Sequence, residues 1–544
     1  MGRAALPSRA APVLTALLLV AAGQAVAAAT DGAVRLRHAV VRRVVEGDPG
    51  TVECVVENPS TAPCLVSDVC LGAVSVKKLT PNVVMWWDVV PNPTPPHGYS
   101  RVVVRLSRAW TWAPMTVTVA AEGGEVGSAV EPASAAPFEA ITFDLDRNLV
   151  YAYLRSPPQA TAPKSVCLDG AALPPEAWSC REAGADRLWA VAAKPPARLI
   201  SGNRYLVEVD PGVGPTQFGF AQCRSGFPIL PQGSVPAPAT LGFDDRPLFS
   251  EFNPADVRPS TDREPCFLLA GDPVCHDMET HSWVGSAPEI VKRAQMARAK
   301  RPAASTFVLV SFPLPNLSYL CYGQIADLLG VNPYRFAAPG HDPLANRSWY
   351  ALARRAQAPG PFLAMCEAFQ PPGWRRPDHN ELRAAVHAAV AAGAKGLIYY
   401  TAQGEDGFAV DPELCRAIAV LNAELRPLRG LLAIGCPARS AVCESAGVDV
   451  ECIVAGHEGI VVFPFDTAFA GPRRTAEEHL TPRVLHDVPL RVSVPAGLKV
   501  ESVKFGFPNA EPLRWESQPD RAIAFRLPRL QVCSPCLVSF AQAP

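Results

Sequence analysis

Between residues 361 and 430, two strongly apolar runs alternate with two segments of helical character. The first run, Pro361–Phe369, precedes the alanine-rich segment Glu381–Gly393, in which Gly393 stands where a helix C-cap is expected. The second run, Ala394–Thr401, has the composition of a buried parallel strand. Strands and helices that alternate in this way predict a parallel sheet with crossover helices, the repeating unit of a (β/α) barrel.

The segment after the second run also begins a helix. Asp411 stands at the N-cap and Pro412 at the first helical position, where proline removes no needed hydrogen bond. Apolar residues then recur on one helical face: Leu414, Ile418, Leu421 and Leu425. A second βα unit therefore follows the first.

Three segments carry a resemblance. Residues 376–400 combine Arg-Pro, Glu-Leu-Arg and Gly-Ala-Lys-Gly-Leu-Ile-Tyr-Tyr. Residues 322–334 read Tyr-Gly-Gln-Ile-Ala-Asp-Leu-Leu-Gly-Val-Asn-Pro-Tyr, and residues 270–273 read Ala-Gly-Asp-Pro. These segments resemble secreted bacterial barrel proteins of the glycoside-hydrolase type. The resemblance covers about residues 260–430 and implies a TIM-type barrel more firmly than an activity.

The resemblance implies paired carboxyl groups, because glycoside hydrolases place an acid and a nucleophile or base across the scissile bond. With Cys266–Asp272 as the fourth strand and Phe362–Glu367 as the seventh, Asp272 would be the general acid and Glu367 the nucleophile or base. The sequence departs from the related pattern at both positions. Gly271 precedes Asp272 where the related proteins read Asp-Glu-Pro, and Glu367 replaces a glutamine.

Both carboxylates also have structural interpretations that the sequence leaves open. Asp272 can cap the segment after its strand, and Glu367 can pair with Arg375 or Arg376. The leading hypothesis, from the strand-end positions and the resemblance together, is a hydrolase that cleaves glycosidic bonds of a polysaccharide. The alternative is a catalytically inactive carbohydrate-binding or cell-surface structural protein with a degenerate barrel.

Aromatic residues gather near the predicted strand ends, where their rings suit the C–H face of a sugar. The substrate-binding candidates are Trp283, Tyr334, Trp349, Trp374, Tyr400 and the acidic Glu405. Tyr399 and Tyr400 are adjacent in one strand, so one of them must point into a packed layer. The expected partner is a polysaccharide or oligosaccharide.

Short apolar runs separated by proline, glycine and asparagine flank the barrel, and their spacing predicts β-sandwich domains. The predicted domains are β-sandwiches at residues 30–136, 137–212 and 442–544 and the barrel at residues 213–435. Plausible barrel strands number about six, short of the usual eight, so either the barrel is incomplete or its early strands are atypical. Trp86 and Trp87 in the first sandwich offer a sugar platform, although one of two adjacent strand residues is expected in the core.

Composition limits the partners. The formal net charge of −1 over 544 residues provides no concentrated basic face, so nucleic acid is not expected to bind. Sixteen cysteines permit disulfides in an exported chain. Cys533 and Cys536 form a lone C-x-x-C motif, which favours a local disulfide or two thiols over a metal site. No dinucleotide, P-loop or zinc-protease motif is present, so no cofactor or metal is expected.

The N-terminus predicts export. Arg3 and Arg9 precede an apolar run over residues 12–22 and small residues that end at Ala27, the pattern of a signal peptide at residues 1–27. That run is too short for a transmembrane helix, and no later segment has about 18 uninterrupted apolar residues. The mature protein is expected to be soluble and secreted or periplasmic. The sequence predicts no oligomeric state.

Overall fold

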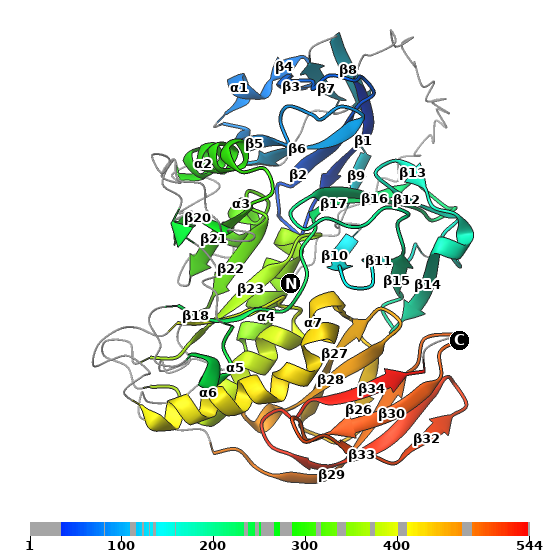
Figure 1. The fold of residues 1–544 in the computed structure, drawn as a ribbon, viewed down its shortest axis with the longest axis vertical. Coiled ribbons are helices and arrows are strands. Elements are labelled where there is room, and N and C mark those ends of the chain that lie inside the picture. The colour runs from blue at the N-terminus through cyan, green and yellow to red at the C-terminus, as the bar shows by residue number, and fades with distance from the viewer. Residues whose placement is uncertain are drawn as a thin grey trace, which may run out of the picture.

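A computed structural model describes the chain over the following residues: 34–80, 82–108, 116–121, 124–129, 131–133, 138–157, 159–232, 238–244, 250–251, 266–271, 286–311, 317–333, 344–369, 376–400, 411–469 and 481–541. Figure 1 shows a central parallel sheet with its helices, and β-sheets above and below it.

The first unit is a pair of sheets that share one core. One sheet has the order β5-β6-β2-β1-β9 and the other the order β4-β3-β7-β8. The strands are β1 Arg35–Arg42, β2 Thr51–Asn58, β3 Val66–Leu71, β4 Val74–Ser75, β5 Val84–Val90, β6 Gly98–Leu106, β7 Thr116–Ala121, β8 Gly124–Ala129 and β9 Glu131–Ala133, with the short helix α1 Val76–Leu79. Valines from both sheets fill the core between them, as in a β-sandwich.

The second unit is another pair of four-stranded sheets, ordered β10-β11-β15-β14 and β13-β12-β16-β17. The strands are β10 Phe138–Asp144, β11 Leu149–Arg155, β12 Ser165–Leu168, β13 Ala171–Ala172, β14 Trp178–Ala183, β15 Leu188–Ala193, β16 Arg204–Asp210 and β17 Gln217–Gln222, with the 3-10 turn Pro175–Ala177. Because β17 pairs antiparallel with β16, this unit extends to residue 222.

The central sheet is parallel and has the order β18-β24-β23-β22-β21-β20-β19. Its strands are β18 Ile229–Gln232, β19 Ser250–Glu251, β20 Cys266–Gly271, β21 Ser305–Ser311, β22 Leu328–Asn332, β23 Phe362–Glu367 and β24 Leu397–Tyr400. The first strand lies beside the last, as it does when a barrel closes. No pairing joins β18 to β19 among the described residues, so the sheet is a partial (β/α) barrel.

Helices cover one face of this sheet. They are α2 Ser286–Lys300, α3 Leu317–Tyr322, α4 Asn346–Gln357, α5 His379–Ala391, α6 Pro412–Leu425 and α7 Arg429–Ile434, with 3-10 turns at Pro238–Leu241 and Arg426–Leu428. Two predicted caps are confirmed: Gly393 follows α5 with φ +99°, and Asp411 caps α6. Asp378 and Glu381 form a capping box at α5 that was not predicted from the sequence.

The C-terminal unit again has two sheets, ordered β25-β27-β28-β34-β30-β31 and β26-β29-β33-β32, around a shared apolar core. The strands are β25 Cys436–Pro437, β26 Ala441–Cys443, β27 Val448–Ala455, β28 Gly459–Asp466, β29 Leu485–Ser493, β30 Val500–Phe505, β31 Glu511–Pro512, β32 Trp515–Gln518, β33 Ala522–Leu530 and β34 Cys536–Phe540, with the 3-10 turn Thr467–Phe469.

The expected disulfides are not found in the described part of the chain, where no two cysteines are bonded. Strand geometry gives one reason. Cys452 and Cys536 pair in register with Val462 from opposite sides. Two strand spacings, about 9.6 Å, therefore separate their backbones, and a disulfide needs Cα atoms within about 7 Å.

Trp86 and Trp87 do not form a joint platform. Trp86 is 2% exposed, and its Nε1 donates to the backbone oxygen of Cys321 in α3 at 2.8 Å, so it packs on the partial barrel. Trp87 is half-buried, with the ammonium group of Lys77 5.9 Å from its ring centre.

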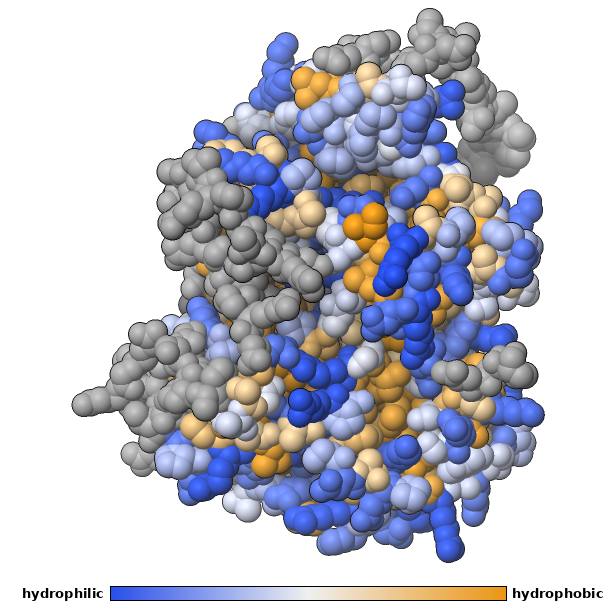
Figure 2. Space-filling view, in the orientation of Figure 1, coloured by the Kyte–Doolittle hydropathy of each residue, from blue (hydrophilic) through white to orange (hydrophobic). Residues whose placement is uncertain are grey.

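Within the described ranges, every helix is too short or too polar to span a bilayer. On the visible face, hydrophobic residues form patches separated by hydrophilic ones (Figure 2).

Candidate functional site

The two faces of the parallel sheet have different neighbours. Tyr399, Cys366 and Val331 belong to the large core that the sheet shares with its helices. The opposite face, called the inner face below, has a smaller apolar core: Cys266, Phe307, Leu309, Leu328, Leu363, Met365 and Ile398. Such filling of the interior by side chains is typical of barrels.

Gly330 shows how tightly the inner face is packed. It follows Leu328 by two residues in β22 and therefore shares its face. A Cβ atom at this position would lie 2.8 Å from Cδ1 of Leu309 and would also contact the Phe307 ring. The large Phe307 side chain thus occupies the space that the missing side chain leaves.

The inner face becomes polar at the carboxyl ends of five neighbouring strands. Side chains alternate between the two faces along a strand, so counting by twos from the apolar inner-face residues shows that the last inner-face residue of each strand is polar. We call these residues the strand-end row: Gln232 in β18, Ser311 in β21, Asn332 in β22, Glu367 in β23 and Tyr400 in β24. Gln232, Tyr400 and Glu367 are in register with one another, and so are Ser311 and Asn332.

The strand-end row is largely buried. Glu367 is 0% exposed, Asn332 is 1% exposed and Ser311 is 4% exposed. The Nδ2 atom of Asn332 lies 3.2 Å from Sδ of Met365, and the Tyr400 ring meets the Phe369 ring edge-on at a centroid distance of 4.6 Å. A buried carboxylate is costly without polar neighbours, and this row provides hydroxyl and amide groups near it.

The structure brings together two of the residues predicted from the sequence. Glu367 and Tyr400 are register partners on adjacent strands. Trp349 lies instead on α4 in the helix layer, where its ring meets Tyr319 edge-on at 6.3 Å. Five further candidates lie outside the described residues: Asp272, Trp283, Tyr334, Trp374 and Glu405.

Two further observations concern Tyr399 and Arg376. Tyr399 is the member of the tyrosine pair that points into the packed layer, as its OH donates to Oδ1 of Asn422 in α6 at 3.1 Å. Arg376, considered above as a partner of Glu367, forms an ion pair with Asp411 at 3.3 Å.

Sequence reasoning missed Gln232, Ser311 and Asn332. Their signal is weak, because strands buried on both faces are continuous apolar runs without the alternation of apolar and polar residues that would identify each face. The available clue was that one polar residue ends each of three such runs. Aligning those runs requires the strand register, which only the structure provides.

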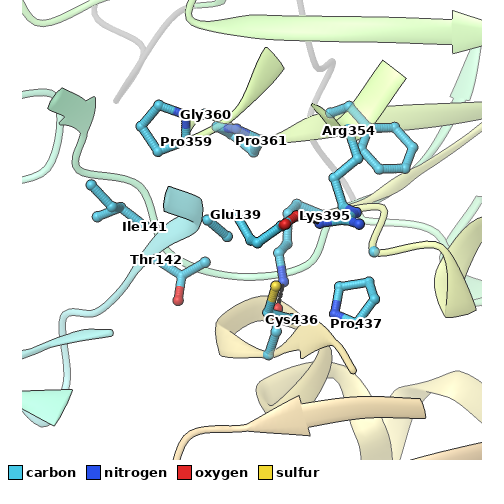
Figure 3. Close-up of a pocket in the computed structure, with 14 residues that line it drawn as sticks. Glu139, Ile141, Thr142, Arg354, Pro359, Gly360, Pro361, Lys395, Cys436 and Pro437 are labelled. Atoms are coloured by element: carbon cyan, nitrogen blue, oxygen red, sulfur yellow. Dashed lines mark hydrogen bonds and ion pairs between the residues drawn. The ribbon is translucent and has the colours of Figure 1, made fainter. Parts of the chain in front are cut away.

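A second polar cluster lies near the amino ends of β23 and β24, at the edge of the sheet opposite the strand-end row (Figure 3). There a small cavity is lined by residues that include Glu139, Arg354, Lys395 and Cys436. Glu139 accepts from Arg354 at 2.5 Å and from Arg155 at 3.0 Å. Burial raises the pKa of Glu139, but the two guanidinium groups outweigh it and hold this pKa below its usual value.

Lys395 and Cys436 in this cluster are deeply buried. Burial lowers the pKa of the Lys395 ammonium group to about 8, and its Nζ donates to the backbone oxygens of Leu432, at 2.9 Å, and of Gly435. Burial raises the pKa of the Cys436 thiol to about 12, which leaves it unreactive. The ion pair between Glu139 of β10 and Arg354 of α4 joins the second unit to the partial barrel, and Lys395 is held by backbone oxygens, so the cluster has a structural role.

No group of three metal-ligating side chains is assembled within the residues that the structure describes. No protein-family model matches the chain, and neither does any curated protein.

Solved structures similar to this chain include three carbohydrate-active enzymes. An Anoxybacillus α-amylase is 14% identical over 47% of this chain and 56% of its own, with a TM-score of 0.30. A Paenibacillus cycloisomaltooligosaccharide glucanotransferase is 8% identical over 93% of this chain and 100% of its own, with a TM-score of 0.35. A Thermotoga maritima α-fucosidase is 14% identical over 46% of this chain and 68% of its own, with a TM-score of 0.24. Scores this low carry no argument, so the fold described above rests on strand order and register alone.

Proposed function

We propose that the protein binds carbohydrate at the carboxyl edge of its partial barrel and hydrolyses a glycosidic bond there. One observation carries the proposal: Glu367 is a fully buried carboxylate on the inner face, at the carboxyl end of its strand. Barrel enzymes carry their catalytic groups at this edge. The Tyr400 ring beside Glu367 adds an aromatic surface of the kind that sugars contact.

The proposed chemistry assigns Glu367 the role of nucleophile or base. As a nucleophile, its carboxylate would attack the anomeric carbon while the leaving oxygen takes a proton from an acid, and water would then release the sugar. As a base, it would take a proton from the attacking water. Asp272, directly after β20, is proposed as the acid. Export through residues 1–27 belongs to the same proposal and is checked by sequencing the N-terminus of the mature protein.

The second candidate is carbohydrate binding without cleavage. Gly271 stands before Asp272 where the resembling proteins have an acid-rich turn, and this departure favours it. The strand-end row would then bind sugar hydroxyls while no second carboxyl group completes the reaction.

Glu367→Gln decides between these functions, because it keeps the shape of the side chain and removes the charge. Purified wild type and variant are incubated with a panel of neutral and acidic polysaccharides. New reducing ends report cleavage, and affinity electrophoresis reports binding. Glu413→Gln is the matched control, since that side chain is 89% exposed on α6. Melting curves show whether each variant folds.

Hydrolysis predicts that wild type and Glu413→Gln release reducing ends, while Glu367→Gln binds and loses at least about a hundredfold in rate. Binding by wild type without release selects the second candidate. Full turnover by folded Glu367→Gln refutes the assigned role, and the absence of any binding or release refutes both functions.

A further inference from the structure

Ser311 has an unusual environment for a buried serine. It is 4% exposed, and its Oγ has no hydrogen-bond partner among the residues that the structure describes. Burying a hydroxyl without a partner costs free energy that alanine at the same position would avoid. A hydroxyl in this state has its donor and its acceptors available to an incoming polar group.

Its position relates this hydroxyl to the candidate site. Ser311 ends the inner face of β21 and is in register with Asn332 in β22, so their backbones lie about 4.8 Å apart. Asn332 in turn contacts Met365, two residues before Glu367. Ser311 and Asn332 therefore extend the strand-end row away from Glu367 along the same edge of the sheet.

The chemistry of the row indicates which ligand suits it. Its five members carry a hydroxyl, two amides, a carboxyl group and a phenol, so none of the described row residues is cationic. Phosphate and carboxylate ligands are usually recognised by arginine or lysine. Neutral hydroxyl groups are matched instead by side chains that both donate and accept.

We infer that Ser311, with Asn332 beside it, forms a subsite that recognises hydroxyl groups of an uncharged sugar unit. This inference rests on the proposed function, because it names the substrate class of the same site. The sugar hydroxyl provides the partner that Ser311 lacks in the described part of the chain. Ser311 is thus a specificity-determining residue, and the unpaired hydroxyl is the cost of recognition.

Ser311→Ala tests this inference, because it deletes one oxygen atom from the subsite. Ser305→Ala is a matched control: Ser305 lies on the same face of the same strand and is 6% exposed, but its Oγ donates to Oε1 of Gln222 at 2.6 Å. Affinity electrophoresis in neutral glucan, xylan and galactan gels, and in polygalacturonate, measures binding. Differential scanning calorimetry measures the melting temperature.

The expected result separates binding from stability. Wild type is retarded by a neutral gel and not by polygalacturonate. Ser311→Ala binds that neutral polysaccharide about 3- to 10-fold more weakly, the loss of one hydrogen bond, and melts at the wild-type temperature or above. Ser305→Ala binds as wild type does and melts at a lower temperature.

Four outcomes overturn the inference. Unchanged affinity in Ser311→Ala, or a fall in its melting temperature as large as that of Ser305→Ala, makes Ser311 structural and leaves the proposed function standing. Retardation by polygalacturonate alone refutes the uncharged ligand. If wild type binds no polysaccharide at all, the proposed function fails, and the subsite fails with it.

Discussion

Replacing Glu139 with glutamine is expected to weaken the contact between the second β-sheet unit and the partial barrel. Glu139 lies in β10 and is 8% exposed, and it accepts from Arg354 of α4 at 2.5 Å. Removing one partner of a buried ion pair leaves the other charge uncompensated and typically costs about 3 to 5 kcal/mol. Arg155, the second partner of Glu139, is 53% exposed and regains water, so we expect about 3 kcal/mol.

Calorimetry can measure this change directly. A loss of about 3 kcal/mol lowers the melting temperature of a unit of about 150 to 250 residues, such as the partial barrel, by roughly 6 to 12 °C. Glu182→Gln is the control, because Glu182 pairs with Arg187 at 3.1 Å while both side chains are 40% exposed, and such surface pairs contribute at most about 1 kcal/mol. Adding Arg354→Met to Glu139→Gln should restore much of the loss, since no buried charge then lacks its partner.

The pH dependence gives a second test of the same contact. The pKa of Glu139 is lowered in the folded protein, so its contribution to stability is present above the ordinary glutamate pKa and is lost as the pH falls through the lowered value. The gap between wild type and Glu139→Gln should therefore narrow in acid. A melting shift no larger than that of Glu182→Gln, or a gap that does not change with pH, would refute the reasoning.

Two further predictions concern the barrel. Burial lowers the pKa of Lys395 to about 8, so between about pH 8 and 10.4 only the unfolded chain binds this proton. The free energy of unfolding should therefore rise by up to about 1.4 kcal/mol per pH unit in this range. Urea unfolding should show this rise in wild type and not in Lys395→Met, and the same pH dependence in both proteins would contradict it. Gly330→Ala should cost about 1 to 3 kcal/mol by overpacking against Phe307 and Leu309. Gly271→Ala is the control that should leave the unfolding midpoint nearly unchanged, because no atom of the described residues lies within 4 Å of its new Cβ.

The elements best predicted from the sequence are those with local signals. The helix α5 was predicted from the alanine-rich segment that ends at Gly393, because a left-handed glycine marks a helix end within a few residues. The sequence predicted a start at Glu381, and the helix begins two residues earlier, at His379, since the capping box places its N-cap three residues before the glutamate.

The features that the sequence did not predict depend on contacts between distant residues. Pairing of β18 with β24 joins Gln232 to Tyr400 across 168 positions of the chain, and no local pattern marks it. One of Trp86 and Trp87 was expected in the core, but the pattern did not indicate that it would be Trp86 or that its indole N–H would donate to α3. The cysteine content permits disulfides, but cysteine spacing along the chain does not give the distance between strands, and no two of the described cysteines are bonded.

The inner face itself argues that the strand-end row is a site and not an irregular part of the core. Below the row, packing is so tight that Gly330 has no room for a side chain. An apolar core would gain stability by continuing to the strand ends. A polar residue at the end of one strand alone could simply be tolerated there. Here the change from apolar to polar occurs in five neighbouring strands at the same edge, and it includes a fully buried carboxylate and an unpaired serine hydroxyl. Stability alone does not explain these two costs together, whereas a ligand that uses both groups does.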